Sequence, residues 1–168
     1  MIQLVLPGAP TPQGRPRMLR TGGVYNPQAK AKTQAKTAVH LQLRGIEKLE
    51  CGLNGHKTPV KTITGLGLYD PSLKGRSQSQ GALELTELPL HLDVTFHMPI
   101  PKSWSLKKRA VAEGSPHVNK PDCDNLIKFI LDVLTGIVYA DDRFVWSINA
   151  RKVYSSTPRT HITLSYDD

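Results

Sequence analysis

The most regular pattern in the chain is an alternation of apolar and polar residues from Leu90 to Met98. Because successive side chains of a strand point to opposite faces of a sheet, this period of two predicts a strand with one buried face. Shorter apolar runs predict strands at 2–6, 145–153 and 160–166. The last two strands are expected to form a hairpin about residues 155–159, because Pro158 favours a turn.

Two further segments carry helical signals. The Ala/Lys/Gln-rich stretch 27–44 lies between Asn26, a residue favoured at helix N-caps, and Gly45, a residue favoured just beyond helix ends. A shorter basic stretch, 106–113, follows Ser105, which is also favoured as an N-cap. The pattern therefore predicts one long helix near the N-terminus and one short helix after the alternating strand.

The most apolar helical pattern begins at Leu126. Leucine, isoleucine and valine recur there at intervals of three and four positions as far as Ile137, with Gly136 near the end. This helix is expected to be largely buried. Together with the predicted strands it indicates an α/β fold of mixed α+β type, in which a small mixed β-sheet is packed with two main helices.

The length of the chain and one stretch without periodicity define the expected domain organisation. With 168 residues, of which 39% are hydrophobic, the chain is expected to form a single domain, 1–168, around one core. Residues from about 50 to 84 are rich in Gly, Ser, Thr and Lys and show no sustained period. We expect a flexible insertion there, which acts as a lid, a DNA-contacting flap or a dispensable segment.

Charge and composition narrow the class of partner. The chain carries 22 Lys and Arg against 14 Asp and Glu, a formal net charge of +8, and residues 1–46 contain no acidic residue. This favours an anionic partner, with nucleic acid as the first candidate. The two cysteines fit neither a disulfide framework nor a zinc pair. No stretch is apolar enough for a membrane span or a signal peptide, so we expect a cytoplasmic protein without a membrane partner.

Acidic side chains gather at the start of the most apolar helix. Asp122 and Asp124 lie two residues apart, and neighbouring carboxylates repel each other unless a positive group lies between them. In the simplest interpretation they cap the helix, and Lys128 pairs with Asp124 one turn later. The alternative is a hard cation, Mg²⁺ or Mn²⁺, which binds carboxylates together with phosphate oxygens. Asp141 and Asp142 follow in a turn that the sequence alone does not place near Asp122.

Several short motifs occur near this helix and near the N-terminus. They are Lys-Pro-Asp-Cys-Asp-Asn-Leu-Ile-Lys at 120–128, Leu-Asp-Val-Leu-Thr-Gly at 131–136, Tyr-Ala-Asp-Asp at 139–142, Pro-Gly at 7–8, Gly-Arg-Pro-Arg at 14–17, Val-Tyr-Asn-Pro at 24–27, His-Met-Pro at 97–99 and Pro-Lys-Ser-Trp at 101–104. Together they resemble the signature of the RusA family of Holliday-junction resolvases. The resemblance covers roughly 1–45 and 88–168 and leaves 46–87 outside.

The resemblance implies a magnesium-dependent homodimeric endonuclease, with Mn²⁺ able to replace Mg²⁺, that nicks two opposing strands of a four-way DNA junction in recombination and repair. It also implies a phage- or prophage-like origin. The metal ligands it implies are Asp122, Asp124 and Asp142, with Asp141 as the alternative to Asp142, and Lys128 completes the catalytic group. Two other functions remain open, namely a metal-dependent flap or fork nuclease and a non-catalytic, structure-selective DNA-binding protein.

DNA contacts are expected from basic side chains in three places. The segment 7–25, rich in proline and glycine, is predicted to be a loop, and its arginines suit phosphate because a guanidinium donates two parallel hydrogen bonds. A second group surrounds Trp104, and a single lysine precedes the acidic motif. The candidate DNA-binding residues are Arg15, Arg17, Lys102, Lys107, Lys108 and Lys120.

Other side chains are expected to be structural. Asp132 lies one turn after Lys128 and is expected to pair with it. Trp104 is expected to pack, with stacking on a DNA base as the alternative, and Phe144 and Trp146 are expected in the core. The small apolar Cys123, between the two aspartates, is expected to face inward.

Overall fold

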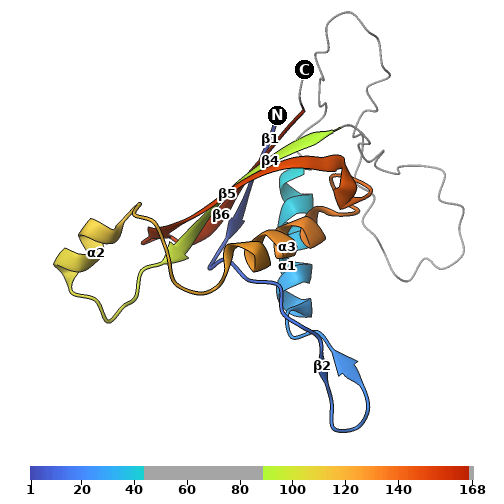
Figure 1. The fold of residues 1–168 in the computed structure, drawn as a ribbon, viewed down its shortest axis with the longest axis horizontal. Coiled ribbons are helices and arrows are strands. Elements are labelled where there is room, and N and C mark those ends of the chain that lie inside the picture. The colour runs from blue at the N-terminus through green and yellow to red at the C-terminus, as the bar shows by residue number, and fades with distance from the viewer. Residues whose placement is uncertain (44–88, 167–168) are drawn as a thin grey trace, which may run out of the picture.

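A computed structural model describes residues 1–43 and 89–166, and the insertion expected at about 50–84 lies outside them. The elements follow in the order β1 (Ile2–Pro7), β2 (Arg17–Met18), β3 (Val24–Tyr25), α1 (Ala29–Leu43), β4 (Leu90–Pro99), α2 (Leu106–Ala112), α3 (Cys123–Leu134), the 3-10 helix η1 (Asp142–Phe144), β5 (Val145–Ser155) and β6 (Arg159–Tyr166). Figure 1 shows α1 and α3 crossing beside the sheet, with α2 apart at one end. In the described ranges no helix combines the length and the apolar character that crossing a membrane requires.

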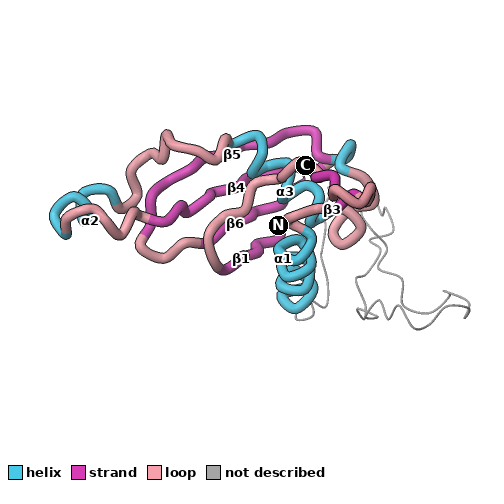
Figure 2. Tube along the Cα trace, turned by 90° about the horizontal axis from the view of Figure 1, so that it is seen from below, coloured by secondary structure: helices cyan, strands magenta, loops and turns pink. Residues whose placement is uncertain are grey.

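Four strands form one mixed sheet in the order β1-β6-β4-β5 (Figure 2). β4 pairs in parallel with β5 and antiparallel with β6, and β6 pairs antiparallel with β1. The predicted small mixed sheet is confirmed. The predicted hairpin between 145–153 and 160–166 is wrong, because β4 lies between these two strands. Their connection passes the end of β4, where Pro99 pairs with Ser155 of β5 and His97 pairs with Arg159 of β6.

The buried face of β4 forms the centre of the core. Its even-numbered residues from 90 to 98 are buried, and the odd-numbered residues between them are half-exposed, which confirms the alternation in the sequence. Helices α1 and α3 pack on the buried face, with Val39 and Leu43 from α1 and Leu126 and Ile130 from α3 in the same cluster. The prediction of a mixed α/β fold with two main helices is therefore confirmed.

The ends of the helices follow from local signals. Gly136 adopts φ +77°, a conformation that favours glycine, just beyond the end of α3 at Leu134. Ser105 caps α2 by accepting a hydrogen bond from the Lys108 amide at 3.4 Å, as predicted. The Asn26 side chain accepts from the Gln28 amide at 2.9 Å, so it closes a turn before α1 rather than capping the helix itself.

The prediction that the whole segment 7–25 is a loop is wrong in part. It contains a small hairpin, in which β2 pairs antiparallel with β3 over two residues each. Strands of two residues are too short to show a period, so the sequence pattern could not indicate them.

Truncation of a side chain on the buried face of α3 should strongly destabilise the domain. Leu126 is fully buried, so Leu126→Ala should lower the free energy of unfolding by about 2–5 kcal/mol, measured by urea denaturation. Val111 is 77% exposed on α2, so Val111→Ala should change the unfolding free energy by less than about 0.5 kcal/mol. Equal effects of the two substitutions would contradict this packing.

Candidate active site

The start of α3 presents two carboxylates to solvent. Asp122 occupies the N-cap position with an extended backbone, but its side chain makes no capping hydrogen bond. Asp124 lies in the first turn, and its Oδ2 atom is 3.2 Å from the Nζ atom of Lys128, with both side chains about three-fifths exposed (61% and 62%). The hydrogen bond from Lys128 lowers the pKa of Asp124. Helix capping by its side chain therefore does not account for the aspartate at position 122. Lys128 partly neutralises the combined negative charge of Asp122 and Asp124.

The segment that leads to Asp122 is held by strand β5. The Nζ atom of Lys152 donates hydrogen bonds to the carbonyl oxygens of Asn119, at 2.9 Å, and Pro121, at 2.7 Å. The His117 amide donates to the Lys152 carbonyl oxygen at 3.0 Å. Lys152 thus fixes the backbone immediately before the acidic motif. Sequence reasoning missed this residue, because a lysine in a predicted strand carries no sign of such a contact.

Burial near the start of α3 shifts the pKa values of His117 and Cys123. His117 is 8% exposed, its ring lies 4.6 Å from the Tyr154 ring, and its buried Nδ1 atom has no hydrogen-bond partner among residues 1–43 and 89–166. Burial and then the positive charge of Lys152 lower the pKa of His117. Burial also raises the pKa of the Cys123 thiol, which packs against the core as expected for an inward-facing residue.

Asp141 and Asp142 lie at the start of η1, after the end of α3, and make different contacts. The Oδ1 atom of Asp141 accepts a hydrogen bond from the Arg143 amide at 3.0 Å, so Asp141 caps the 3-10 helix. Within the part of the chain that the structure describes, the Asp142 side chain makes no hydrogen bond or ion pair. It lies within electrostatic range of Tyr139, where burial is the main cause that raises the pKa of the hydroxyl.

The two acidic groups lie before and after helix α3 along the chain. The helix has 12 residues and is therefore about 18 Å long. Asp122 and Asp124 lie at its start and Asp142 beyond its end. Accordingly, residues 1–43 and 89–166 contain no group of three or more His, Cys, Asp or Glu side chains that could hold a metal ion within one protomer. Two exposed carboxylates nevertheless fit Mg²⁺, which usually binds proteins through one or two carboxylates and completes its shell with water and substrate phosphate.

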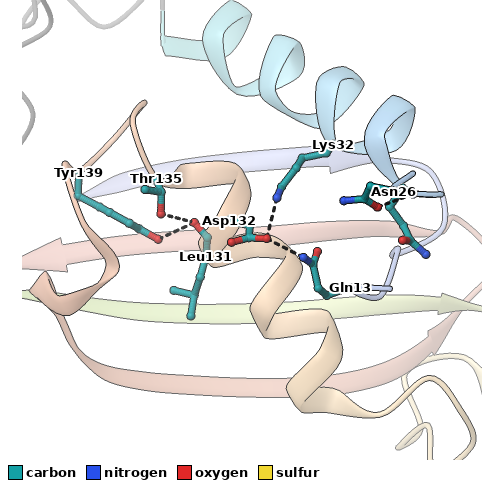
Figure 3. A network of polar contacts seen from close by, with 8 residues as sticks. Gln13, Asn26, Lys32, Leu131, Asp132, Thr135 and Tyr139 are labelled. Atoms are coloured by element: carbon teal, nitrogen blue, oxygen red, sulfur yellow. Dashed lines mark hydrogen bonds and ion pairs between the residues drawn. The ribbon is translucent and has the colours of Figure 1, made fainter. Parts of the chain in front are cut away.

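Asp132, in the last turn of α3, connects this helix with α1 and the N-terminal loop (Figure 3). Its Oδ2 atom is 2.6 Å from Nζ of Lys32 on α1 and accepts a hydrogen bond from Nε2 of Gln13 at 2.7 Å. The Gln13 amide donates to the Asn125 carbonyl oxygen at 2.7 Å. The predicted pairing of Asp132 with Lys128 is therefore wrong, because Asp132 faces α1 and the N-terminal loop instead. The contacts of Gln13 attach that loop to the first turn of α3.

The candidate DNA-binding residues are exposed and lie in two regions. Along the long axis of the molecule, α2 lies on one side of α3 and the β2–β3 hairpin on the other (Figures 1 and 2). Arg15 and Arg17 belong to the hairpin side, two and four residues after the anchored Gln13. The remaining four lie before α2, on α2, or just before α3, and they are Lys102, Lys107, Lys108 and Lys120.

The tryptophans differ in their surroundings. Trp104 is half-buried, its ring lies 5.3 Å from the Tyr154 ring, and Nζ of Lys108 lies 4.0 Å from its ring centroid. Its packing role is confirmed. Trp146 is 60% exposed on β5, and Phe144 is only half-buried, so the prediction that both belong to the core is wrong. Both lie next to the edge of the sheet, which leaves room for solvent or a partner.

Comparison with known proteins gives two matches. Residues 69–165, more than half of the chain, match the family model described as "Endodeoxyribonuclease RusA". The chain belongs to the RusA family. The match begins inside the segment 46–87 that the motif resemblance left outside, and it does not extend to the N-terminal motifs. RusA-family proteins are endodeoxyribonucleases that act on branched DNA, so this chain is assigned to the nucleases with DNA as its partner.

The second match is the protein named "Uncharacterized protein YqaN" from Bacillus subtilis (strain 168), which is 26% identical over 167 residues. The alignment covers 97% of this chain and 94% of that protein. That name assigns no activity, but the coverage of both chains shows a relative of similar length.

The electrostatic effect of Lys152 on the candidate site can be measured directly. Lys152→Met removes a positive charge that lowers the pKa of His117, so the pKa of His117 should rise towards its ordinary value while remaining below it because of burial. NMR titration of the His117 ring protons gives this pKa. Lys120→Met, which removes an exposed lysine from the same segment, should leave the titration unchanged. An unchanged pKa in Lys152→Met would contradict the arrangement.

Proposed function

We propose that this RusA-family protein is a magnesium-dependent Holliday-junction resolvase that makes paired symmetric nicks in four-way DNA junctions, in recombination and repair. The observation that carries the proposal is the pair Asp122 and Asp124. Both carboxylates are exposed, and that of Asp122 is free of the capping role that its position would otherwise explain. A basic chain that presents two unburied acids at one helix start is suited to a cation that faces a polyanion.

In this proposal Asp122 and Asp124 hold the metal ion, Mg²⁺ or in its place Mn²⁺. The bound ion supplies Lewis acidity at the scissile phosphate and lowers the pKa of water. Lys128, which already contacts Asp124, contributes a second positive charge beside the phosphate and stabilises negative charge that develops on its oxygens. Lys152 holds the backbone that precedes Asp122 and so positions the first carboxylate.

Basic side chains on both sides of α3 bind the DNA backbone in this proposal. Arg15 and Arg17 reach phosphates from the hairpin side, while lysines on and near α2 do so from the other side. The Gln13 contacts with α3 support this assignment for the arginines, because a loop fixed to the catalytic helix loses less conformational freedom when it binds DNA.

The proposal also includes a homodimer in which Asp142 of the partner subunit completes each metal site. Within one protomer the described residues bring no three metal-binding side chains of His, Cys, Asp or Glu together, and a coordination sphere has a radius of only about 2 Å. A two-fold axis across the middle of α3 would place the start of one helix beside the end of the other. Asp142, whose carboxylate makes no hydrogen bond or ion pair with the described residues, suits this role better than Asp141, which caps η1.

The surface beside α3 supports the dimer. Strand β5 lies at the edge of the sheet, and two large apolar residues on it, Trp146 and Ile148, are 60% and 42% exposed. Exposed apolar side chains along an open strand are typical of surfaces that another chain covers. A dimer through this surface would give two active sites for two opposing strands of a junction.

The proposed activity can be tested on a mobile synthetic four-way junction. With Mg²⁺ the protein should produce symmetric, ligatable nicks, and without a divalent ion it should bind the junction but leave it intact. Asp122→Asn or Asp124→Asn should reduce cleavage on the order of a hundredfold or more while junction binding is retained. Linear duplex, flap and fork substrates separate the alternatives, since equal cleavage of any of them would overturn the assignment as a junction resolvase.

The composite site can be tested by subunit mixing. Asp122→Asn and Asp142→Asn homodimers should each be inactive. Mixed dimers of the two should regain nicking of one strand, because one of their two sites then contains only unaltered residues. Mixed dimers of Asp122→Asn and Asp124→Asn form the matched control and should remain inactive, since both changes fall on the same side of the site. No recovery in either mixture would show that each site lies within one protomer.

A further inference from the structure

Four large apolar side chains of the β2–β3 hairpin are exposed to solvent. Met18 is 80% exposed, Val24 66%, Leu19 48% and Tyr25 41%. An isolated two-stranded hairpin is only marginally stable in water, and grouped exposed apolar side chains are typical of binding surfaces. Figure 1 shows the hairpin projecting away from the sheet, beyond the start of α1. Its apolar residues therefore do not serve the core and are available to a partner.

The pairing of the two strands gives the hairpin two chemically different faces. Met18 pairs with Val24, and Arg17 pairs with Tyr25. Because paired residues share a face and successive residues alternate, one face of the hairpin is apolar and the other carries a cation beside an aromatic ring. The Leu19 amide donates to the Gly23 carbonyl oxygen at 2.6 Å and closes the tip.

Both ends of the hairpin are attached to the two main helices. On one side, Gln13 contacts Asn125 and Asp132 on α3. On the other side, Asn26 closes the turn that leads into α1 by accepting from the Gln28 amide. The hairpin is therefore carried by the same helix that presents Asp122, and a partner bound to the hairpin is held in a fixed relation to the candidate active site.

The charge around the hairpin identifies the class of partner. Arg15, Arg17 and Arg20 are all exposed, and no acidic residue occurs in 1–46. A second copy of this chain carries the same positive charge, so its hairpin region would be repelled, whereas nucleic acid offers phosphates for the arginines and apolar base faces for the other side chains. Apolar side chains placed between base steps are an established way for proteins to unstack and bend DNA.

We propose that the hairpin at residues 17–25 inserts at the crossover of a four-way junction and contacts unstacked bases with Met18 and Val24 on its apolar face, while its arginines hold the flanking phosphates. This inference deepens the proposed function, on which its substrate rests. It assigns to the hairpin the recognition of the branch point, separately from cleavage at Asp122 and Asp124. Selectivity for junctions over duplex then comes from base contacts that a continuous duplex does not offer.

The test uses a junction with 2-aminopurine at the crossover, in the absence of Mg²⁺, so that binding and base unstacking are observed without cleavage. The full-length protein should increase the fluorescence of the probe. Met18→Ser and Val24→Ser should remove most of this increase and weaken junction binding about tenfold, with binding of linear duplex unchanged. Leu41→Ser, which removes a 59% exposed apolar residue from α1, should retain the full signal and is the matched control.

The possible results separate this inference from the proposed function. A full fluorescence increase in both hairpin variants overturns the insertion. Loss of the dimer in those variants, measured by sedimentation, also overturns it and assigns the hairpin to subunit contact. If the unaltered protein gives the fluorescence increase but does not cleave junctions when Mg²⁺ is added, the hairpin inference stands and the proposed nuclease activity fails.

Discussion

Burial of the apolar face of α3 against the sheet is the interaction on which the candidate site depends. Each fully buried Leu or Ile on this face, such as Leu126 and Ile130, contributes about 1.5–3 kcal/mol relative to an exposed side chain. Two carboxylates exposed to bulk water repel each other by only about 1 kcal/mol even at a separation of about 4 Å. The packing is therefore strong enough to hold Asp122 and Asp124 at the exposed start of α3 without any cation, so the two carboxylates are in place before the proposed metal ion or DNA binds.

Several weak polar contacts attach the N-terminal loop to α3. The Asp132 side chain is 44% exposed and that of Lys32 is 26% exposed, so their ion pair is partly screened by solvent and is worth on the order of 1 kcal/mol at most. The loop is attached by this pair together with the two hydrogen bonds of Gln13. Several weak contacts from three elements thus fix a segment that contains no long element of its own.

Sequence patterns predicted the elements whose periods are long enough to read. Strand β4 and helix α3 repeat their apolar positions over nine or more residues, and both were placed correctly. The order of the strands was not encoded in any such pattern, because insertion of β4 between β5 and β6 changes neighbours without changing which residues are buried. The two-residue strands at Arg17 and Val24 are too short for any period.

In the candidate site, contacts between sequence neighbours could be predicted and contacts between distant residues could not. Asp122, Asp124 and Lys128 are neighbours on one helix, so the contact between Asp124 and Lys128 follows from the rise and turn of a helix and could be expected. Asp132 joins Lys32 across 100 positions, and Lys152 reaches Pro121 across 31 positions, so neither contact has a local signal. The aspartates of the Asp141–Asp142 pair look alike in sequence, and only the hydrogen bond from the Arg143 amide distinguishes the capping residue from its neighbour.

A site with so few ligands has a thermodynamic consequence for the proposed nuclease. If protein carboxylates provide only part of the coordination shell, substrate phosphate must provide another part, and metal affinity depends on bound DNA. Because such coupling is reciprocal, the metal raises the affinity for correctly placed DNA by the same factor as DNA raises the affinity for the metal. Lys128 strengthens this coupling, because its positive charge repels a cation at Asp124. A bound phosphate attracts the lysine and so reduces that repulsion. In the proposed nuclease, cleavage would thereby be confined to DNA whose shape brings a phosphate to the start of α3, and a strongly basic protein could bind duplex widely without cutting it.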